Sequence, residues 1–327
     1  MKLHRRKFLH LAAGAVVLPA LPGIARAQAY PTRPITIVVP FPAASPADVL
    51  ARLMIERMRA SLGQPIVVDN VSGAAGSLAP GRVARAAADG YTVIIGTVGT
   101  HVFNGAIYSL PYDVANDFAP ISVLPSNYQL LVANNAATDL KGLVTWIKAN
   151  PDRVTAGMAG AGSPSHLTAL YFQNAIGARF QFVPYRGTPL AVQDVIAHQI
   201  DLVFDQASSS LPLVRSGRLK TYGVTAKRRL ASAPEIPTLD EAGLPGFLSS
   251  IWFGMWAPKN TPRSIVTALN AAVVDALADA VVRGRLGELG SEIPAREQQT
   301  PEALAALQRA EIEKWWPIIK SANIKPE

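Results

Sequence analysis

Four loops rich in glycine, hydroxyl side chains and other small residues stand where predicted strands lead into predicted helices. They span residues 40–48, 70–77, 96–101 and 157–166. The carboxyl ends of parallel strands meet at one edge of a sheet, and ligands bind there against helix N-termini. Backbone N–H groups and hydroxyls at such an edge can hold an anion, for example a carboxylate. One such loop is more often only a tight turn, but four at equivalent places indicate a binding cleft.

A second chemistry, nucleophilic catalysis, is suggested by Ser163 and Ser165 beside His166. A serine hydrolase that uses either serine with this histidine is therefore the alternative to a binding protein. Adjacent residues at a helix start point in different directions, and the G-x-S-x-G motif of such enzymes is absent. The phosphate-binding motifs G-x-x-x-x-G-K and G-x-G-x-x-G after a strand are also absent. These absences favour binding over catalysis.

The sequence offers a poor set of metal ligands. It has no cysteine, and His101, His166 and His198 are scattered histidines without an H-E-x-x-H motif. We therefore expect no metal and no cofactor. His101 and His166 each stand at a loop-to-helix junction, where they either orient the loop through hydrogen bonds or touch a ligand.

Further polar residues follow strands in the second half of the chain. Tyr185, Arg186 and Gly187 lie between a predicted strand and a predicted helix. Arg186 either clamps a carboxylate with two hydrogen bonds or pairs with an acid such as Asp205. Asp205 ends another strand, where it can accept a hydrogen bond from an amine, a hydroxyl or a water.

Short strands alternate with helices over most of the chain, which predicts parallel sheets covered by helices on both faces. We expect strands at 35–39, 65–68, 91–95, 129–133, 153–156, 180–183, 201–204, 219–224 and 251–257. Helices are expected at 49–62, with Asp48 as their cap, and at 78–88, 140–149, 165–176, 188–198, 270–289 and 301–320. Residues 111–125 read as irregular, and the tail from Pro262 reads as helical without strands.

A strandless tail must pack on a sheet that already exists. If it returns to the first α/β unit, the chain crosses between the units near 126–129 and near 249–252. This predicts an α/β, two-lobed periplasmic-binding-protein fold of the Venus-flytrap, type II-like kind, with two strand crossovers. Residues 28–126 plus 252–327 would form the first lobe, and residues 127–251 the second. Trp252 lies in the second crossover, where we expect it to pack the hinge.

The first 27 residues read as an export signal. A basic head with Arg5 and Arg6 precedes an apolar run at 11–18 and a small-residue site that ends at Ala27. This pattern predicts a cleaved signal peptide of the twin-arginine type, and hence the periplasm. The remaining 300 residues hold 26 basic and 23 acidic side chains, a net charge of +3 instead of +8. A net positive charge this small disfavours binding to nucleic acid.

Many pieces of the chain, taken in order, resemble the substrate-binding proteins of tripartite tricarboxylate transporters, the Bug family of periplasmic receptors. These pieces are residues 30–41, 62–70, 88–92, 99–101, 110–113, 117–118, 183–187, 237–238, 241–246 and 254–258. The resemblance implies a two-lobed receptor that captures a small organic carboxylate, often a dicarboxylate, and passes it to a membrane permease. An aromatic carboxylate is the other ligand class to consider, because Phe41 and Tyr185 could flank a ring. A monomer is expected. A ligand-sensing partner of a membrane kinase is a further alternative, which the residues do not separate from transport.

The resemblance also implies ligand-binding residues. They are Phe41, Pro42, Ala43, Ala44, Ser45, Thr97, Thr100, His101, Ala161, Gly162, Ser163, His166, Tyr185, Arg186, Gly187 and Asp205. One carboxylate would be gripped by main-chain amides and hydroxyls of 41–45, Thr97 and Thr100 in the first lobe and of Gly162, Ser163 and His166 in the second. Tyr185, Arg186 and Asp205 would face the other end of the ligand. The family usually has two glycines where this chain has Ala44 and Ser45. Because side chains there restrict φ and narrow the approach to a ligand, we expect an altered pocket mouth.

Overall fold

Three parallel strands open the part of the chain that the structure describes. The structure, a computed structural model, describes residues 30–134 and 136–321. Strand β1 (Ile35–Val39) is almost wholly buried and lies between β2 (Ile66–Asn70) and β3 (Thr92–Thr97) in parallel register. The connections are α1 (Pro46–Leu62) and, after the short turn η1 (Ala74–Gly76), α2 (Leu78–Ala84). The predicted β-α-β-α-β order is confirmed here.

Helix α1 begins earlier than predicted. Ser45 is its N-cap, with a side-chain oxygen that accepts the N–H of Asp48, and Pro46 occupies the first turn. The helix ends at Gly63, whose φ of 67° is left-handed. The prediction of Asp48 as the cap is therefore wrong. Its carboxylate lies inside the first turn and accepts hydrogen bonds from Ala44, Arg52 and Asn70 instead.

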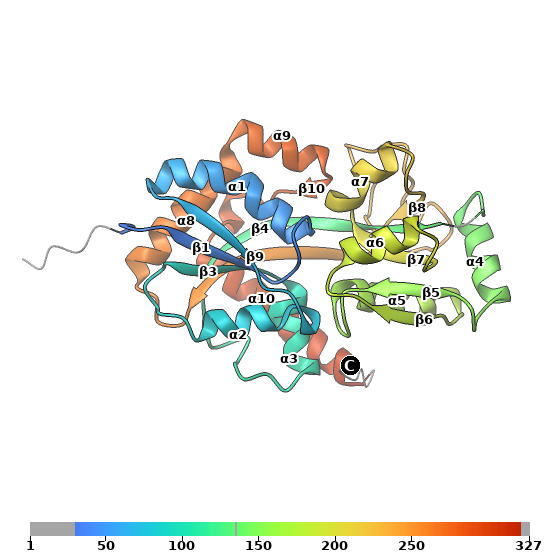
Figure 1. Cartoon of the computed structure of the whole chain (residues 1–327), viewed down its shortest axis with the longest axis horizontal. Coiled ribbons are helices and arrows are strands. Elements are labelled where there is room, and N and C mark those ends of the chain that lie inside the picture. The colour runs from blue at the N-terminus through green and yellow to red at the C-terminus, as the bar shows by residue number, and fades with distance from the viewer. Residues whose placement is uncertain (1–29, 135, 322–327) are drawn as a thin grey trace, which may run out of the picture. The chain divides into compact units, whose positions relative to one another are not determined.

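Two long antiparallel strands, β4 (Phe118–Ala133) and β9 (Ser250–Pro258), connect the two lobes (Figure 1). β9 lies between β3 and the first half of β4, whereas the second half of β4 pairs with β7 (Leu202–Gln206) and β8 (Thr221–Val224). The prediction of an irregular segment up to Pro125 is wrong from Phe118 onward. Pro120 and Pro125 indicated a loop, because proline is usually excluded from a paired strand. In the structure the β4–β9 register shifts beside each of them, so β4 contains both prolines and still pairs with β9.

The second lobe has helices on both faces of its strands. β5 (Thr155–Met158) lies between β6 (Gln181–Pro184) and β7, all in parallel. One core, which includes Phe172 and Phe204, packs beneath α4 (Leu140–Ala149) and α5 (Pro164–Ile176). The other core packs beneath α6 (Thr188–Ile196) and α7 (Ala207–Arg215), a helix that the sequence did not indicate.

The tail returns to the first lobe, as expected for a strand-poor segment. α8 (Arg263–Ala278) packs on α1, and α10 (Pro301–Ser321) packs on β4 and on the short helical segment η2 (Gly99–Phe103) that precedes α3 (Asn104–Ile107). The single helix predicted over 270–289 is wrong, because Asp279 leaves helical geometry and caps α9 (Ala280–Glu288). The prediction that the tail has no strand is also wrong. A short strand, β10 (Ser291–Glu292), precedes the turn η3 (Arg296–Gln298) and pairs with β4.

The chain thus has the predicted two-lobed α/β fold with two strand crossovers. The boundaries 126/127 and 251/252 stay predictions, and the predicted signal peptide lies outside the described residues. Within those residues, no single helix is both long and apolar enough to cross a membrane; α8 and α9 reach that level only as a pair bent by 67°.

Candidate functional site

A narrow pocket lies where the strand ends of the two lobes face each other. Its enclosed volume is only about 30 Å³, so the two lobes lie close together around it. The lining residues come from both lobes and both crossover strands: Phe41, Ser45, Pro46, Ala47, Thr97, Gln129, Ala159, Pro164, Ser165, Thr188, Phe204, Gln206, Ile251 and Phe253. These side chains are all uncharged, and three phenylalanines give the pocket apolar walls.

Four helices begin at this pocket. Ser45 and Ser163 cap α1 and α5, α6 starts at Thr188, and Gln206 is the N-cap of α7. The first turn of a helix leaves N–H groups without partners and carries the positive end of the helix dipole. Four such ends around one pocket suit a negatively charged ligand, even though no lysine or arginine lines it.

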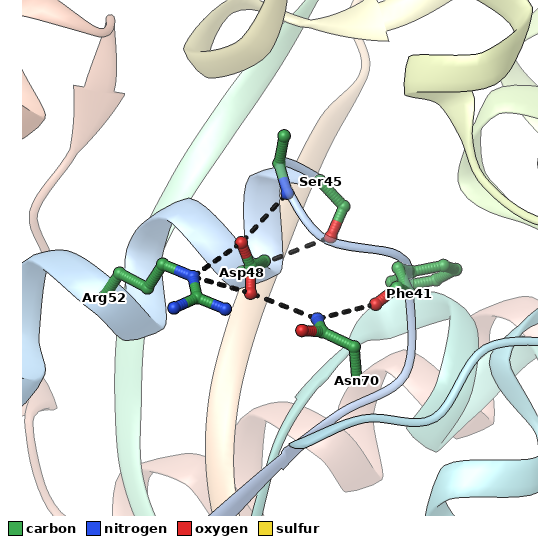
Figure 2. A network of polar contacts seen from close by, with 6 residues as sticks. Phe41, Ser45, Asp48, Arg52 and Asn70 are labelled. Carbon is green, nitrogen blue, oxygen red and sulfur yellow. Dashed lines mark hydrogen bonds and ion pairs between the residues drawn. The ribbon is translucent and has the colours of Figure 1, made fainter. Parts of the chain in front are cut away.

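One buried carboxylate, that of Asp48, holds the loop between β1 and α1 (Figure 2). Its Oδ2 accepts the N–H of Ala44 and the Nε–H of Arg52, each at 2.9 Å. Its Oδ1 accepts Nδ2 of Asn70 at 3.1 Å, and the same nitrogen donates to the carbonyl of Phe41 at 2.9 Å. Burial raises the pKa of Asp48, but these hydrogen bonds and the Arg52 charge outweigh it, so the pKa lies below the ordinary value.

Ala44 has a left-handed backbone, with φ at 63°. This is the conformation that glycine adopts at little cost and that a side chain makes unfavourable. The hydrogen bond from its N–H to Asp48 helps to hold the strained residue in place. The loop therefore follows a path suited to glycine although the chain has alanine there.

The hydroxyls after β3 bond mainly to one another. Thr97 N–H donates to Thr100 Oγ1 at 2.9 Å, and Thr100 N–H donates to Thr97 Oγ1 at 3.3 Å. Thr100 Oγ1 also lies 2.9 Å from Nδ1 of His101. Only Thr97 lines the pocket, and the other two residues support it from behind.

His101 is a fully buried residue of the first-lobe core. Its ring stacks on Trp256 with centroids 3.8 Å apart and meets the edge of Phe118. Burial lowers the pKa of His101 to about 3, so the ring is neutral at ordinary pH. The sequence left open whether His101 orients its loop or touches a ligand, and the geometry favours orientation of the loop.

The loop between β5 and α5 is tied together by its own side chains. Ser163 Oγ accepts the N–H of His166 at 3.3 Å and lies 3.0 Å from Ser165 Oγ, which accepts the N–H of Ala159 at 3.0 Å. Nδ1 of His166 accepts the N–H of Gly162 at 2.9 Å. Burial lowers the pKa of His166 to about 4. The imidazole thus bonds to the loop backbone and is a weak base.

Glycines let the loops of the two lobes touch. A Cβ on Gly187 would lie 2.7 Å from Cδ of Pro42, and one on Gly99 would lie 2.7 Å from Cδ of Pro164. Tyr108 Oη donates to the carbonyl of Ala161 at 2.6 Å. These contacts bring the two loop sets together around the pocket.

The residues predicted to face the far end of the ligand do not line the pocket. Tyr185 donates its hydroxyl hydrogen to Asp194 at 2.7 Å, and the Arg186 side chain is exposed. Asp205 is buried and accepts from the hydroxyls of Ser209 and Ser210 rather than from Arg186. Burial raises the pKa of Asp205 despite these bonds.

Of the predicted ligand-binding residues, Phe41, Ser45 and Thr97 line the pocket. Pro42, Ala43 and Ala44 lie between Phe41 and Ser45, and Thr100 and His101 follow Thr97. Ala161, Gly162, Ser163 and His166 surround the start of α5, and Gly187 directly precedes Thr188. The sequence reasoning missed Gln129, Thr188 and Gln206 as lining residues. The strand-end rule could have found the last two, since Thr188 lies five residues and Gln206 two residues after the end of a predicted strand. Gln129 required knowledge that a crossover strand passes beside the pocket.

The described residues contain no group of three or more His, Cys, Asp or Glu side chains placed to hold a metal ion. The pocket offers hydroxyls, amides and backbone N–H groups instead, which are ligands for an organic anion.

Comparisons with known proteins agree with this chemistry. A family model described as "Tripartite tricarboxylate transporter family receptor" matches residues 50–324. MatC from Rhodopseudomonas palustris, solved with bound malate, is 39% identical with a TM-score of 0.84, over 89% of this chain and 100% of that one. A second R. palustris protein, solved with adipate, is 34% identical with a TM-score of 0.86, over 91% and 100%. The periplasmic binding protein BugD is 35% identical with a TM-score of 0.87, over 91% and 100%.

Proposed function

The chain belongs to the family of tripartite tricarboxylate transporter receptors, and we propose that it is a periplasmic receptor that captures a small organic carboxylate between its lobes and delivers it to a membrane permease. The pocket carries this proposal, because four helix N-termini meet there among uncharged lining residues. N–H and O–H groups can replace the hydration of a carboxylate through charge-assisted hydrogen bonds.

A dicarboxylate is the first ligand class to consider. The relatives solved with malate and adipate support it. Phe41, Phe204 and Phe253 favour a ligand with an apolar body between or beside its polar ends, so aromatic carboxylates belong in the same panel.

One carboxylate of the ligand would be gripped from both lobes. In the first lobe, the donors would be the loop 41–45 and Thr97; in the second, they would be the α5 start beside Gly162 and Ser163. Thr188 and Gln206 add donors that the resemblance did not include. Tyr185, Arg186 and Asp205 would act from behind or at the rim, since they do not line the pocket.

The protein would act without catalysis, as a monomer that is exported with its signal peptide removed after Ala27. The serine hydrolase is not favoured, because Nδ1 of His166 bonds to Gly162 N–H and Ser163 Oγ caps α5. Its pKa of about 4 also makes His166 a poor general base near neutrality.

A thermal-shift screen tests the proposal. Malate, adipate and aromatic carboxylates are compared with their neutral amides, which keep the size and lose the charge. A true ligand at a hundred times its Kd stabilises the protein by about 2.7 kcal/mol, and its amide should give almost no shift. If every carboxylate leaves the melting temperature unchanged while an ester is hydrolysed, the receptor proposal is wrong.

A further inference from the structure

A second cavity, larger than the pocket, is a groove distinct from it. It has a volume of about 780 Å³ and lies between α5 of the second lobe and α10 of the first, and Tyr128 and Trp252 of the crossover strands also line it. Successive side chains of a strand point to opposite faces. Trp252 lines this groove and Phe253 lines the pocket, so the two cavities lie on opposite faces of β9. We call it the hinge groove.

The hinge groove exposes large apolar side chains. Tyr171 is 44% exposed, and Leu248 and Ile318 are each 49% exposed. Trp315 and Trp252 add indole rings beside them. A contiguous apolar surface of this kind marks a binding surface in soluble proteins, and tryptophan and tyrosine are the residues that contribute most at protein interfaces.

The charges of the groove are arranged to favour an acidic partner. Oε2 of Glu311 accepts Nε1–H of Trp252 at 3.3 Å and of Trp315 at 3.1 Å, so this carboxylate is used to fix the two indoles. Lys227 and Lys314 also line the groove and are exposed. Among the described residues, neither lysine forms an ion pair with a carboxylate.

The two walls belong to different lobes. α5 packs on β5 and β7, whereas α10 packs on β4 and η2. Rotation of the lobes about the crossover strands therefore changes the width of the groove. Pro164 and Ile251 border both the groove and the pocket. An occupant that spans both walls would bind one interlobe angle best, which couples it to ligand capture in the pocket.

We propose that the hinge groove is the docking surface for the membrane component of the transporter, which would insert an amphipathic segment with an apolar face and acidic flanks. The proposal rests on the receptor function proposed above. The groove runs between a helix of each lobe and carries exposed apolar side chains on both walls, which suits an elongated apolar occupant. Its two helical walls resemble the grooves that accept an amphipathic helix. The acidic flanks would meet Lys227 and Lys314.

Photo-crosslinking in cells that express the transporter tests this surface. A photoreactive phenylalanine analogue replaces Leu248 or Ile318, and the control replaces Val281, which is apolar, 73% exposed and outside the groove. We expect crosslinks to the membrane component from the two groove positions, altered by added carboxylate, and none from Val281. No crosslink, equal crosslinking from Val281, or a product that contains only a second copy of this chain would overturn the proposal.

Uptake measurements separate this proposal from the receptor function. The Leu248→Ser/Ile318→Ser variant should lower carboxylate uptake about ten-fold while its carboxylate affinity stays unchanged, and Val281→Ser should change neither. Unchanged uptake in the groove variant would overturn the docking surface alone. If the wild-type protein binds no carboxylate, the receptor function itself fails. The crosslinking result decides the matter where the double variant does not fold.

Discussion

Asp48 determines the geometry of the first pocket loop at the scale of single residues. Its side chain is 3% exposed, whereas that of its partner Arg52 is 53% exposed, so the carboxylate is buried and the cation reaches water. Three donors, from Ala44, Arg52 and Asn70, depend on its two oxygens. Removal of the charge leaves these donors with one amide oxygen.

The Asp48→Asn variant is therefore expected to unfold more easily, by about 1–3 kcal/mol, and to bind carboxylate more weakly. Thermal unfolding and ligand titration measure the two effects. The control is Asp69→Asn, which breaks an exposed pair with Arg82 at 2.7 Å and should change the free energy of unfolding by less than about 1 kcal/mol. Equal losses in both variants would show that Asp48 has no special role.

Ala44 provides a second test of the same loop. Because its φ is 63°, a β-branched residue should be strained there. We expect Ala44→Val to lower the melting temperature and weaken binding, whereas Ala44→Gly should be as stable as the wild type within about 1 kcal/mol. Differential scanning fluorimetry compares them. A valine variant as stable as the glycine variant would contradict the left-handed conformation.

Two buried histidines predict how stability depends on pH. Burial lowers the pKa of His166 to about 4 and that of His101 to about 3, from 6.5. Below pH 6.5 the unfolded chain binds protons that the folded chain excludes, so the free energy of unfolding falls as pH falls from 6.5 towards 4, and towards 3 for His101. Each histidine contributes up to about 1.4 kcal/mol per pH unit.

Denaturation at a series of pH values checks this dependence. The His166→Asn variant keeps a side-chain acceptor for Gly162 N–H but does not titrate, so its stability should fall less steeply over the same range. Asp205 is unchanged in both proteins, so its raised pKa cancels in the comparison. Parallel pH profiles for the two proteins would refute the assignment.

The residue types of the loops predicted the location of the pocket well, but they did not predict which side chains face it. Thr97 and Thr100 belong to one small-residue loop, but Thr100 turns its hydroxyl back to the backbone of Thr97, and only Thr97 reaches the pocket. That choice depends on the backbone path of η2. Spacing does not encode this path, because the five-residue turn is neither a regular helix nor a standard turn.

At the scale of elements, the loop contacts between lobes depend on single glycines. Gly187 precedes α6 in an extended conformation, with φ at 180°, so an alanine there meets only steric resistance from Pro42. We expect Gly187→Ala to hinder lobe closure and weaken carboxylate binding about ten-fold, with little loss of stability because the open lobes avoid the clash. Calorimetric titration measures the affinity.

Two further variants complete this test. Gly284→Ala, on α9 with nothing within 4 Å of the new Cβ, should bind normally. Pro42→Ala in the Gly187→Ala background should restore part of the affinity, because it removes the ring that the new methyl meets. No rescue, or an equal loss in Gly284→Ala, would argue against closure through this contact.

Most elements could be predicted because buried parallel strands are short apolar runs between turns. β1 and β7 show this pattern, and both were expected close to their observed positions. The first half of β4 was missed because Pro120 and Pro125 suggest a loop, and only the pairing with β9 reveals the bulges that admit them. β10 has two residues and no pattern of its own, so only its partner β4 defines it.

At the scale of the whole molecule, two lobes and two crossover strands create two cavities with different chemistry. The pocket has uncharged polar donors and faces converging helix N-termini, whereas the hinge groove has indoles, apolar side chains and two lysines. The alternation of strands and helices predicted the lobes. It could not predict the groove, because its walls, α5 and α10, are about 130 residues apart in the chain and meet only through the packing of the tail.

A crystal structure of the protein with the carboxylate found by the thermal-shift screen is the most direct measurement of the central claim. We predict that the ligand lies between the lobes, with its carboxylate oxygens about 2.7–3.2 Å from N–H and O–H donors at the starts of α1, α5, α6 or α7. A carboxylate bound outside the pocket, or held there mainly by lysine or arginine side chains, would contradict the account.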